Sequence, residues 1–582
     1  MADEHVGSTP PHRPRDLTPA QLGFTPAKPV AWLSPVQLAG TGLRVALSGI
    51  QGSYLDKREL QGSFPDEVDR EAGPDGELWI DFVADLGDGF DATYSVAYLL
   101  AQPRLTVGDH VLPRGRALVL GGDEVYPTPS TQRYEDRLIG PYRAALPSVP
   151  DGGDPPRMYA LPGNHDWYDG LTAFLRLFTG SRRTEIGGWH LPQNRSYFAV
   201  RLPAGWWLFA LDDQASTYLD DPQLEYFTRV AAGFGPDPKV IIASASPTWV
   251  QGADRPAVHE SLDYFLRTVI APTGARVRLM LSGDWHHYAR YSGPDRELIT
   301  CGGGGAYLYP THQLPESIEV PPAPLQTSSP RETYTLESRF PGKRMSQAYA
   351  ASIFGRLPKH NPSFIAMVGA VHTALLLAAD GVLSSGFGSP LQKFALVPLF
   401  LLIAAVIAGT YAFAHLSDSL EGRHRRRVLG LLHGAAHLGL AALGTWAWQE
   451  LPMHAWRWPW SLIATLTVYG VVSGLAATEL VAVYLLCAAR FGVNLNELFS
   501  ASGIIDSKSF LRLHIAADGT LTVYPIGVRR AARRWRADPD GEPHTSWIVP
   551  VDRLHAHLIE EPIVLAPAPA PATSAGAADP SR

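Results

Sequence analysis

The sequence predicts an α/β domain, followed by a four-helix membrane region and a small β-containing segment. Three observations support this order. Short apolar runs in the first half of the chain end in polar side chains, four longer apolar runs lie between residues 361 and 489, and an alternating segment around a tight turn follows them. A chain of 582 residues also exceeds one ordinary domain, so two or three domains are expected.

The composition narrows the class of protein. A net charge of -7 argues against a nucleic-acid-binding protein, so no nucleic-acid partner is expected. The two cysteines are Cys301 and Cys487, and the second lies within an apolar run, which favours free thiols in a reducing compartment. The first residues have no apolar core and predict no secretory signal. We expect a partly disordered lead over residues 1–74 and a disordered Ala/Pro-rich tail over 561–582.

Four short apolar runs in the α/β domain predict strands whose ends carry polar side chains. The runs and the polar residues after them are Leu78–Ala84 with Asp85, Ala117–Leu120 with Asp123 and Tyr126, Met158–Leu161 with Asn164, His165 and Asp166, and Leu279–Ser282 with Asp284, His286 and His287. Side chains at the ends of neighbouring strands meet at one edge of a sheet. Carboxylate, amide and imidazole groups together suit iron, manganese or zinc, and a pair of ions needs a bridging carboxylate.

In this order the motifs resemble the calcineurin-like metallophosphoesterases, over roughly residues 75–312. Gly122–Tyr126 and the Asp85-Leu86-Gly87 motif are similar to the purple acid phosphatase branch, while Gly283–His286 is similar to the PhoD-like phosphodiesterases. The resemblance implies an α/β fold for residues 75–340, with a β-sandwich of two packed sheets flanked by helices. It also implies hydrolysis of a phosphate monoester or diester through attack by a metal-bound hydroxide.

The resemblance implies a set of ligands for one or two divalent or trivalent ions. These are Asp85, Asp123, Tyr126, Asn164, Asp284 and His286. Asp123 would bridge both ions, and Tyr126 would bind as a phenolate or, alternatively, pack in the core with its hydroxyl satisfied. The resemblance further implies that His165, which is not a ligand, gives a proton to the leaving group or steadies the phosphate. Asp166 would orient the second nitrogen of that histidine.

One position departs from the family pattern. The family usually places a metal-binding histidine two residues before a proline, whereas this chain has Ala245 before Pro247. His259 or His312 could complete the ligand set, or a water could do so, or the second ion binds weakly.

Three further residues are candidates for contact with the substrate. His287 follows the metal-binding histidine directly, so it either meets the substrate or supports the ligands from behind. Gly303 and Gly304 belong to a run of four glycines after a strand. Their amides could bind phosphate, or the run could be a plain flexible turn.

Four apolar runs over residues 361–489 are each about long enough to span a bilayer. They cover roughly Phe364–Leu383, Ala395–His415, Val428–Trp448 and Leu462–Ala488. A buried helical bundle in a soluble protein is the alternative, although four successive runs so poor in charge are unusual there. His433 and His437 lie one helical turn apart, and with Glu479 they indicate either polar packing between helices or a metal or proton role.

The basic residues predict the orientation of the spans. Most lie before the first span, between the second and third, and after the fourth: Lys343, Arg344, Arg356, Lys359, Arg423, Arg425, Arg426, Arg427 and Arg490. The other two loops contain little more than Lys393 and Arg457. We therefore expect a multi-pass protein of the cell (inner) membrane, with the α/β domain and the carboxyl terminus in the cytoplasm.

Residues 490–560 are expected to form a small cytoplasmic domain. Phe510–Ile515 and Thr520–Tyr524 flank Asp518-Gly519, which predicts a hairpin with a tight turn. Five arginines between residues 529 and 536 either face anionic headgroups or form a solvated basic surface.

Together these features favour a membrane-anchored, metal-dependent phosphoesterase that acts on a phosphorylated small molecule or lipid. Because one metal ligand is missing, an inactive sensor that binds metal or ligand and signals to the membrane helices is the alternative. A transport or channel unit regulated by the α/β domain is a third reading, and the scarcity of ionisable residues in the spans counts against it. The substrate and the oligomeric state are left open.

Overall fold

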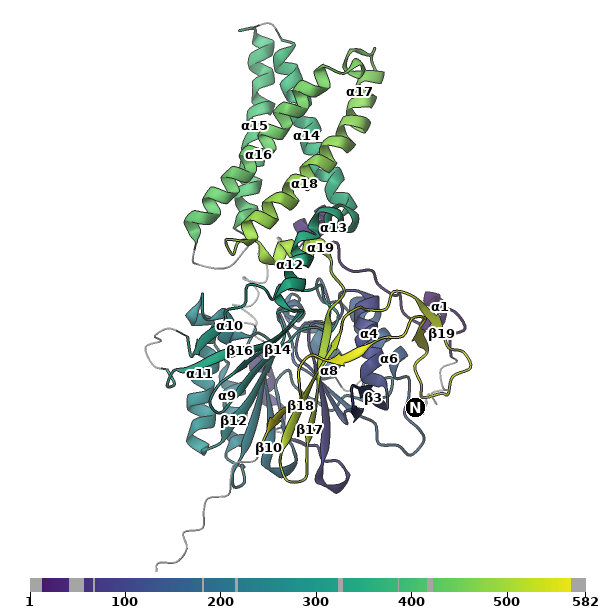
Figure 1. Cartoon of the computed structure of the whole chain (residues 1–582), viewed down its shortest axis with the longest axis vertical. Helices are drawn as coiled ribbons and strands as arrows, with labels where there is room; N and C mark the ends of the chain where they lie inside the picture. The colour runs from purple at the N-terminus through teal and green to yellow at the C-terminus, as the bar shows by residue number, and fades with distance from the viewer. Residues whose placement is uncertain are drawn as a thin grey trace, which may run out of the picture.

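The computed structural model describes residues 13–40, 57–65, 68–180, 183–214, 218–322, 328–385, 387–415 and 422–566. The outermost parts of the expected lead and tail, residues 1–12 and 567–582, lie outside these ranges. An α/β head and a bundle of four long helices make up most of the described chain, and short helices lie between them (Figure 1).

Two mixed nine-stranded sheets form the head. In spatial order, the first sheet contains β1 (Asp69–Arg70), β9 (Phe198–Arg201), β10 (Trp206–Leu211), β11 (Lys239–Ser244), β12 (Arg276–Ser282), β14 (Glu297–Cys301), β13 (Tyr288–Ser292), β16 (Glu332–Phe340) and β15 (Ser317–Val320). The second contains β21 (Ala556–Leu558), β18 (Leu521–Val528), β17 (Lys508–Ile515), β2 (Leu78–Val83), β5 (Ala117–Leu120), β6 (Arg157–Ala160), β8 (Trp189–His190) and β7 (Glu185–Ile186), with β22 (Ile563–Leu565) paired to β18. The four strands expected to end in polar side chains are β2, β5, β6 and β12, so these strand predictions are confirmed.

The two sheets pack face to face, and helices cover their outer faces. Alternation along β5 shows why: Val119 shares a core with Leu279 of the first sheet, whereas Leu118 shares a core with Tyr94 of a covering helix. The covering helices are α4 (Phe90–Ala101), α6 (Gly140–Ala145) and α8 (Thr172–Phe178) on the second sheet, and α9 (Asp221–Ala231) and α11 (Glu260–Phe265) on the first. Because both faces are covered, central strands such as β5 and β10 are apolar throughout.

The carboxyl-terminal strands belong to the head. The expected hairpin is confirmed, with β17 antiparallel to β18 and Gly519 at a φ of 85° in the turn. However, β17 also pairs with β2, so the expectation of a separate domain over residues 490–560 is wrong. A buried ion pair fixes this join, because Arg512 donates to both carboxylate oxygens of Asp81 at 2.7 and 2.9 Å. The second sheet is therefore built from segments that precede the membrane region in the sequence and from segments that follow it.

Four helical stretches are long and apolar enough to cross a membrane, as expected. They are α14 (Pro362–Leu383), α15 (Pro390–Ala414), α16 (Arg423–Gln449) and Trp460–Ala489, which ends in α18 (Gly470–Ala489). Between the head and this bundle lie α12 (Lys343–Ala351), α13 (Ile353–His360) and α19 (Leu495–Ser502) (Figure 1).

Small residues and histidines pack the bundle. A Cβ atom at Gly369 of α14 would lie 2.3 Å from the carbonyl oxygen of Gly470 in α18, so these helices approach backbone to backbone. The histidines of α16 face each other as expected, with 3.1 Å between the Nε2 atoms of His433 and His437. This row of histidines continues into α14, because His372 Nε2 lies 3.1 Å from His437 Nδ1.

Candidate functional site

Three aspartates at strand ends adopt the same unusual backbone conformation. Asp85 follows β2, Asp123 follows β5 and Asp284 follows β12, with φ values of 59°, 56° and 63°. Non-glycine residues seldom occupy this left-handed region, and such strain persists where the surrounding structure enforces it. The backbone amide of Asp284 donates to Asp85 Oδ1 at 3.2 Å, which joins the ends of the two sheets.

The hydroxyl of Tyr126 is the centre of the site. It lies 2.9 Å from Asp85 Oδ1, 3.1 Å from Asp123 Oδ2 and 3.0 Å from His286 Nε2. His286 donates through Nδ1 to the carbonyl oxygen of Tyr307 at 2.8 Å, so its Nε2 carries a lone pair. We call Asp85, Asp123, Tyr126 and His286 the rim cluster. One hydroxyl hydrogen faces three acceptors there, and it can satisfy only one of them well.

Two glycines make room for the carboxylates. A Cβ atom at Gly163 would lie 2.1 Å from Asp123 Oδ1, and one at Gly302 would lie 2.1 Å from Asp85 Oδ2. Any side chain at either position would displace a carboxylate of the rim cluster. The glycines are therefore part of the site, although they contribute no functional group.

The electrostatics of the cluster favour a cation. Burial raises the pKa values of Asp85 and Asp123 well above their ordinary range, and neighbouring carboxylates raise them further. Burial also raises the pKa of Asp284. For His286 burial lowers the pKa well below its usual value, so this imidazole stays neutral. A positive ion would relieve the repulsion between the carboxylates and would use the free lone pair of the imidazole.

Unpartnered atoms fit the same interpretation. Asp85 Oδ2 and Asn164 Oδ1 are buried and have no hydrogen-bond partner among the described residues. Within those ranges, no three His, Cys, Asp and Glu side chains form a preformed metal site. The candidate metal site has other donors besides His, Cys, Asp and Glu. The hydroxyl of Tyr126 joins the rim cluster, and Asn164 adds an amide oxygen. Carboxylate, phenol, amide and imidazole donors suit iron, manganese or zinc.

His165 lies beside the rim cluster, but Asp166 does not orient it. His165 Nδ1 is 2.8 Å from the carbonyl oxygen of Pro127, which fixes the ring and leaves Nε2 for a ligand. The carboxylate of Asp166 instead accepts from the backbone amides of Gly163 and Glu124, at 3.0 and 3.3 Å, and from the hydroxyl of Tyr134. The predicted role of Asp166 is therefore wrong, because its carboxylate is used to hold the loop.

The ligand set predicted for a second metal ion is less complete. Asp284 Oδ2 accepts from Gln251 at 2.7 Å and from Ser246 at 3.1 Å, so hydrogen bonds hold this carboxylate in place. Ala245 is buried and its Cβ faces Gly122, so it offers no donor there. Sequence reasoning did not identify Gln251 and Ser246 as partners of Asp284; Ser246 directly follows Ala245, and Gln251 ends α10 (Thr248–Gln251).

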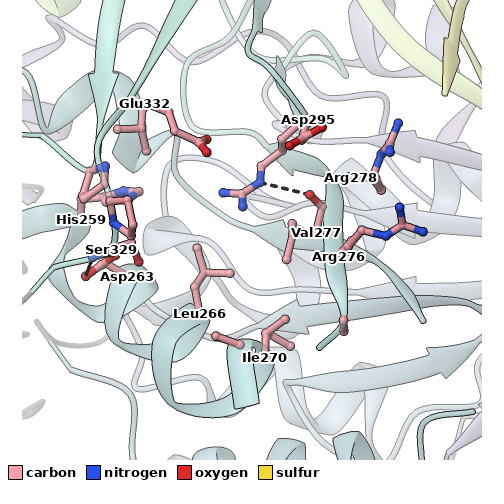
Figure 2. Close-up of a pocket in the computed structure, with 16 residues that line it drawn as sticks. His259, Asp263, Leu266, Ile270, Arg276, Val277, Arg278, Asp295, Ser329 and Glu332 are labelled. Carbon is pink, nitrogen blue, oxygen red and sulfur yellow. Dashed lines mark hydrogen bonds between the residues drawn. The ribbon is translucent and has the colours of Figure 1, made fainter. Parts of the chain in front are cut away.

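Neither proposed substitute histidine reaches the rim cluster. His259 bonds Thr248 Oγ1 at 2.9 Å and lines a separate pocket of about 490 Å³ with Asp263 and Arg296 (Figure 2). His312 Nδ1 bonds the hydroxyl of Ser346 at 2.8 Å. The gap at Ala245 is therefore not filled by either residue.

The predicted substrate contacts of His287, Gly303 and Gly304 are also wrong. His287 is fully buried, its ring lies against Trp285 and Tyr309, and burial lowers its pKa to about 3. The amide of Gly304 donates to the carbonyl oxygen of Ala84, and that of Gly303 to the sulfur of Cys301. The carbonyl oxygen of Gly303 accepts from the amide of Ser509. These glycines allow the loop to pass close to both sheets, so their backbone is not available to phosphate.

A cavity of about 530 Å³ opens over the site. Its lining includes predicted residues: Asp123, Asn164, His165, Asp284 and His286. It also includes Arg255, Tyr307 and residues of α19, which sequence reasoning did not identify. Trp32 was missed as well; its ring lies 5.7 Å from that of His165 and 5.5 Å from that of Tyr307. No motif marks these residues, because they reach the site from distant parts of the chain.

Comparisons with known proteins do not assign a family. No family model matches the chain, and no curated protein matches it. Among solved structures, one similar chain is described as "GAP50 the anchor in the inner membrane complex of Plasmodium". The two share 13% sequence identity, and the match covers 40% of this chain and 74% of that one with a TM-score of 0.30. So distant a likeness carries no conclusion about function.

Proposed function

We propose that the head is a metal-dependent phosphoric ester hydrolase of the calcineurin-like metallophosphoesterase type, anchored to the membrane by the bundle. One observation carries the proposal: the rim cluster places a single phenolic hydrogen among three acceptors, beside a cavity. The ordered motifs of β2, β5, β6 and β12 supply the family resemblance. The substrate class is a phosphate monoester or diester of a small molecule or lipid.

The residues that would hold metal are the rim cluster for one ion, and Asp123, Asn164 and Asp284 for a second. Metal ions there would act as Lewis acids toward phosphoryl oxygens and would make a bound water more acidic. Asn164 Oδ1 lacks a partner among the described residues, which leaves this oxygen available as a ligand.

Two further side chains would act on the substrate directly. His165 offers Nε2 toward the cavity, since Nδ1 is taken by Pro127, and this nitrogen could exchange a proton with the leaving oxygen. Arg255 also lines the cavity and makes no ion pair within the described part of the chain, so its guanidinium could pair with a phosphate. Replacing His165 with alanine should lower turnover at least ~10²-fold while leaving metal content unchanged.

We further propose that the protein lies in the cell (inner) membrane with the head in the cytoplasm. The end of α15 packs against elements next to the head: Ala414 shares a core with Leu357 and Phe499, and Asn494 donates to the carbonyl oxygen of Phe413 at 2.9 Å. The basic start of α16 follows this end directly. Positive charge therefore collects on the head side of the bundle, which is the pattern of a cytoplasmic face.

The test is to purify the full chain in detergent, count bound iron, manganese and zinc, and measure hydrolysis of an aryl phosphate and its diester. We expect one or two ions per chain and measurable turnover. Asp123→Asn should lose at least ~10-fold in metal affinity. The exposed Asp552→Asn is the matched control and should retain the ions.

A sensor without turnover is the second candidate, and the alanine at position 245 is the observation that favours it. With Asp284 held by Ser246 and Gln251, the second set of ligands is one short of the family pattern. Retained metal without hydrolysis of either ester, after iron, manganese or zinc is added, would support the sensor.

A further inference from the structure

The cavity over the rim cluster is lined in part by the segment that joins the last membrane-spanning helix to the head. Its lining includes Gly492, Leu495 and Asn496, which follow the last membrane-spanning helix directly. Leu495 and Asn496 begin α19, which lies between the head and the bundle together with α12 and α13 (Figure 1). The strand ends that carry the candidate site thus point toward the membrane.

Hydrogen bonds fix the cavity to the membrane helices. Gln313, in the cavity wall, donates to the carbonyl oxygen of Ala489, the last residue of α18, at 2.7 Å. Tyr307, whose carbonyl oxygen orients His286, donates through its hydroxyl to Asn496 at 2.6 Å. One tyrosine therefore joins a residue of the rim cluster to α19. Direct contacts from the head to the end of α18 and to α19 therefore hold the site next to the bundle.

The cavity combines polar and apolar walls. Its polar part includes the site residues Asp123, Asn164, His165, Asp284 and His286, and also Arg255, Asp254 and Glu497. Its apolar part includes Val250, Leu314 and Leu495. A small polar phosphate ester would not need an apolar wall, whereas a phosphate attached to a hydrocarbon chain would bury part of that chain there.

The short helices α12 and α13, which contact the cavity-lining helix α19, are suited to lie in a headgroup layer. Phe491 precedes the cavity residue Gly492 and is 55% exposed, while Met345 of α12 and Phe354 of α13 are 53% and 40% exposed. Basic residues on the same short helices include Arg344 and Arg356. Exposed apolar side chains interspersed with basic ones are typical of helices at a membrane interface.

We propose that the substrate is a membrane lipid with a phosphate in its headgroup, which enters the cavity from the bilayer beside Leu495. This inference rests on the proposed hydrolase function. The phosphate would reach the rim cluster and Arg255, and the acyl or alkyl chain would pass Leu495 toward the bilayer. Hydrolysis would break the bond between phosphorus and the ester oxygen, with water supplying the hydroxyl to phosphorus and a proton to the lipid alcohol.

The experiment uses two phosphate monoesters that differ only in their alkyl chains. The full chain is reconstituted in phosphatidylcholine vesicles, and phosphate release is measured from hexadecyl phosphate in the same vesicles and from butyl phosphate in solution. We expect kcat/KM at least ~10²-fold higher for hexadecyl phosphate, because the membrane holds this substrate near the site. Leu495→Gln should reduce the ratio of the two values several-fold, whereas Val564→Gln, an exposed substitution on β22, should keep the wild-type ratio.

The possible outcomes separate this inference from the function on which it rests. Equal or faster hydrolysis of butyl phosphate would overturn the lipid inference and leave the hydrolase in place. Hydrolysis of neither ester, and of neither an aryl phosphate nor its diester, with metal bound, would overturn both. A ratio that Leu495→Gln does not change would show that the apolar wall does not receive the alkyl chain, and would count against entry from the bilayer.

Discussion

The head and the membrane bundle both bury polar side chains, but they satisfy them differently. In the rim cluster one phenolic hydrogen faces three acceptors, and two oxygens nearby have no partner among the described residues. In the bundle, His437 uses both ring nitrogens, one on His372 and one on His433. A cation from outside would complete the first arrangement. In the histidine row the inner nitrogens pair with one another, and only the outer ones, His372 Nδ1 and His433 Nδ1, lack a partner among the described residues. Buried polar groups indicate a ligand where unpaired atoms border a cavity.

The largest expected effect concerns the join between the two ends of the head. Arg512→Met would leave the carboxylate of Asp81 buried without its cation, so it should destabilise the head by about 3–5 kcal/mol. Chemical unfolding in detergent, followed by tryptophan fluorescence, measures this loss. The control is Arg534→Met, whose partner Asp552 is equally exposed, and it should cost less than about 1 kcal/mol. Equal small losses would mean that β17 is not essential to the sheet.

The second prediction uses pH on another buried charge of the head. Lys508 is fully buried, its ammonium donates to the carbonyl oxygen of Ala306, and burial lowers its pKa to about 8. Between about pH 8 and 10.4 the unfolded chain then binds more protons than the folded one, so the unfolding free energy should rise with pH. The full gain is about 3 kcal/mol.

The measurement for Lys508 is the difference in unfolding free energy between the wild-type protein and Lys508→Met, at several values from pH 7 to pH 10. The difference should shift in favour of the wild type as the pH rises, because the variant has no ammonium to discharge. A constant difference would mean that the lysine keeps an ordinary pKa in the folded head.

The local sequence pattern predicted many of the secondary-structure elements of this protein. Strand ends such as Asp85 and Asp123, the four spans and the turn at Gly519 follow from apolar periodicity and from residue types that suit one local structure. Contacts between distant segments could not be predicted in this way. Nothing near Arg512 indicates that it pairs with Asp81, more than 400 residues earlier.

The candidate site shows the same limit. Its motifs predicted which residues meet at the rim, but the hydrogen bonds of those residues depend on neighbours from other segments. Asp166 and His165 are adjacent in sequence, yet their side chains bond to different partners. Trp32 and Asn496 join the site from opposite ends of the chain and belong to no motif.

The third prediction concerns how the bundle packs. Gly369→Ala would place a Cβ atom against the carbonyl oxygen of Gly470, which should push α14 and α18 apart and cost about 1–3 kcal/mol. Gly439→Ala is the control, because a Cβ atom there meets nothing within 4 Å. Unfolding of the protein in bicelles by sodium dodecyl sulfate compares the two variants. Equal stability would show that α14 and α18 can separate without loss.

The smallest effect is expected from the histidine chain, and it tests the comparison between head and bundle most directly. His437→Leu removes the central ring and leaves His372 and His433 without their inner partners, which should cost about 1 kcal/mol in the membrane. His454→Leu is the control; this histidine is partly exposed and lies 3.4 Å from Asp380, so its loss should change stability by less than about 0.5 kcal/mol. None of the contacts described above joins a cavity residue of the head to one of these three histidines. Both variants should therefore keep wild-type metal content and phosphate release. Loss of turnover in His437→Leu alone, with the fold intact, would show that the membrane histidines act on the site, and the contrast between a ligand site and a packing cluster would then be wrong.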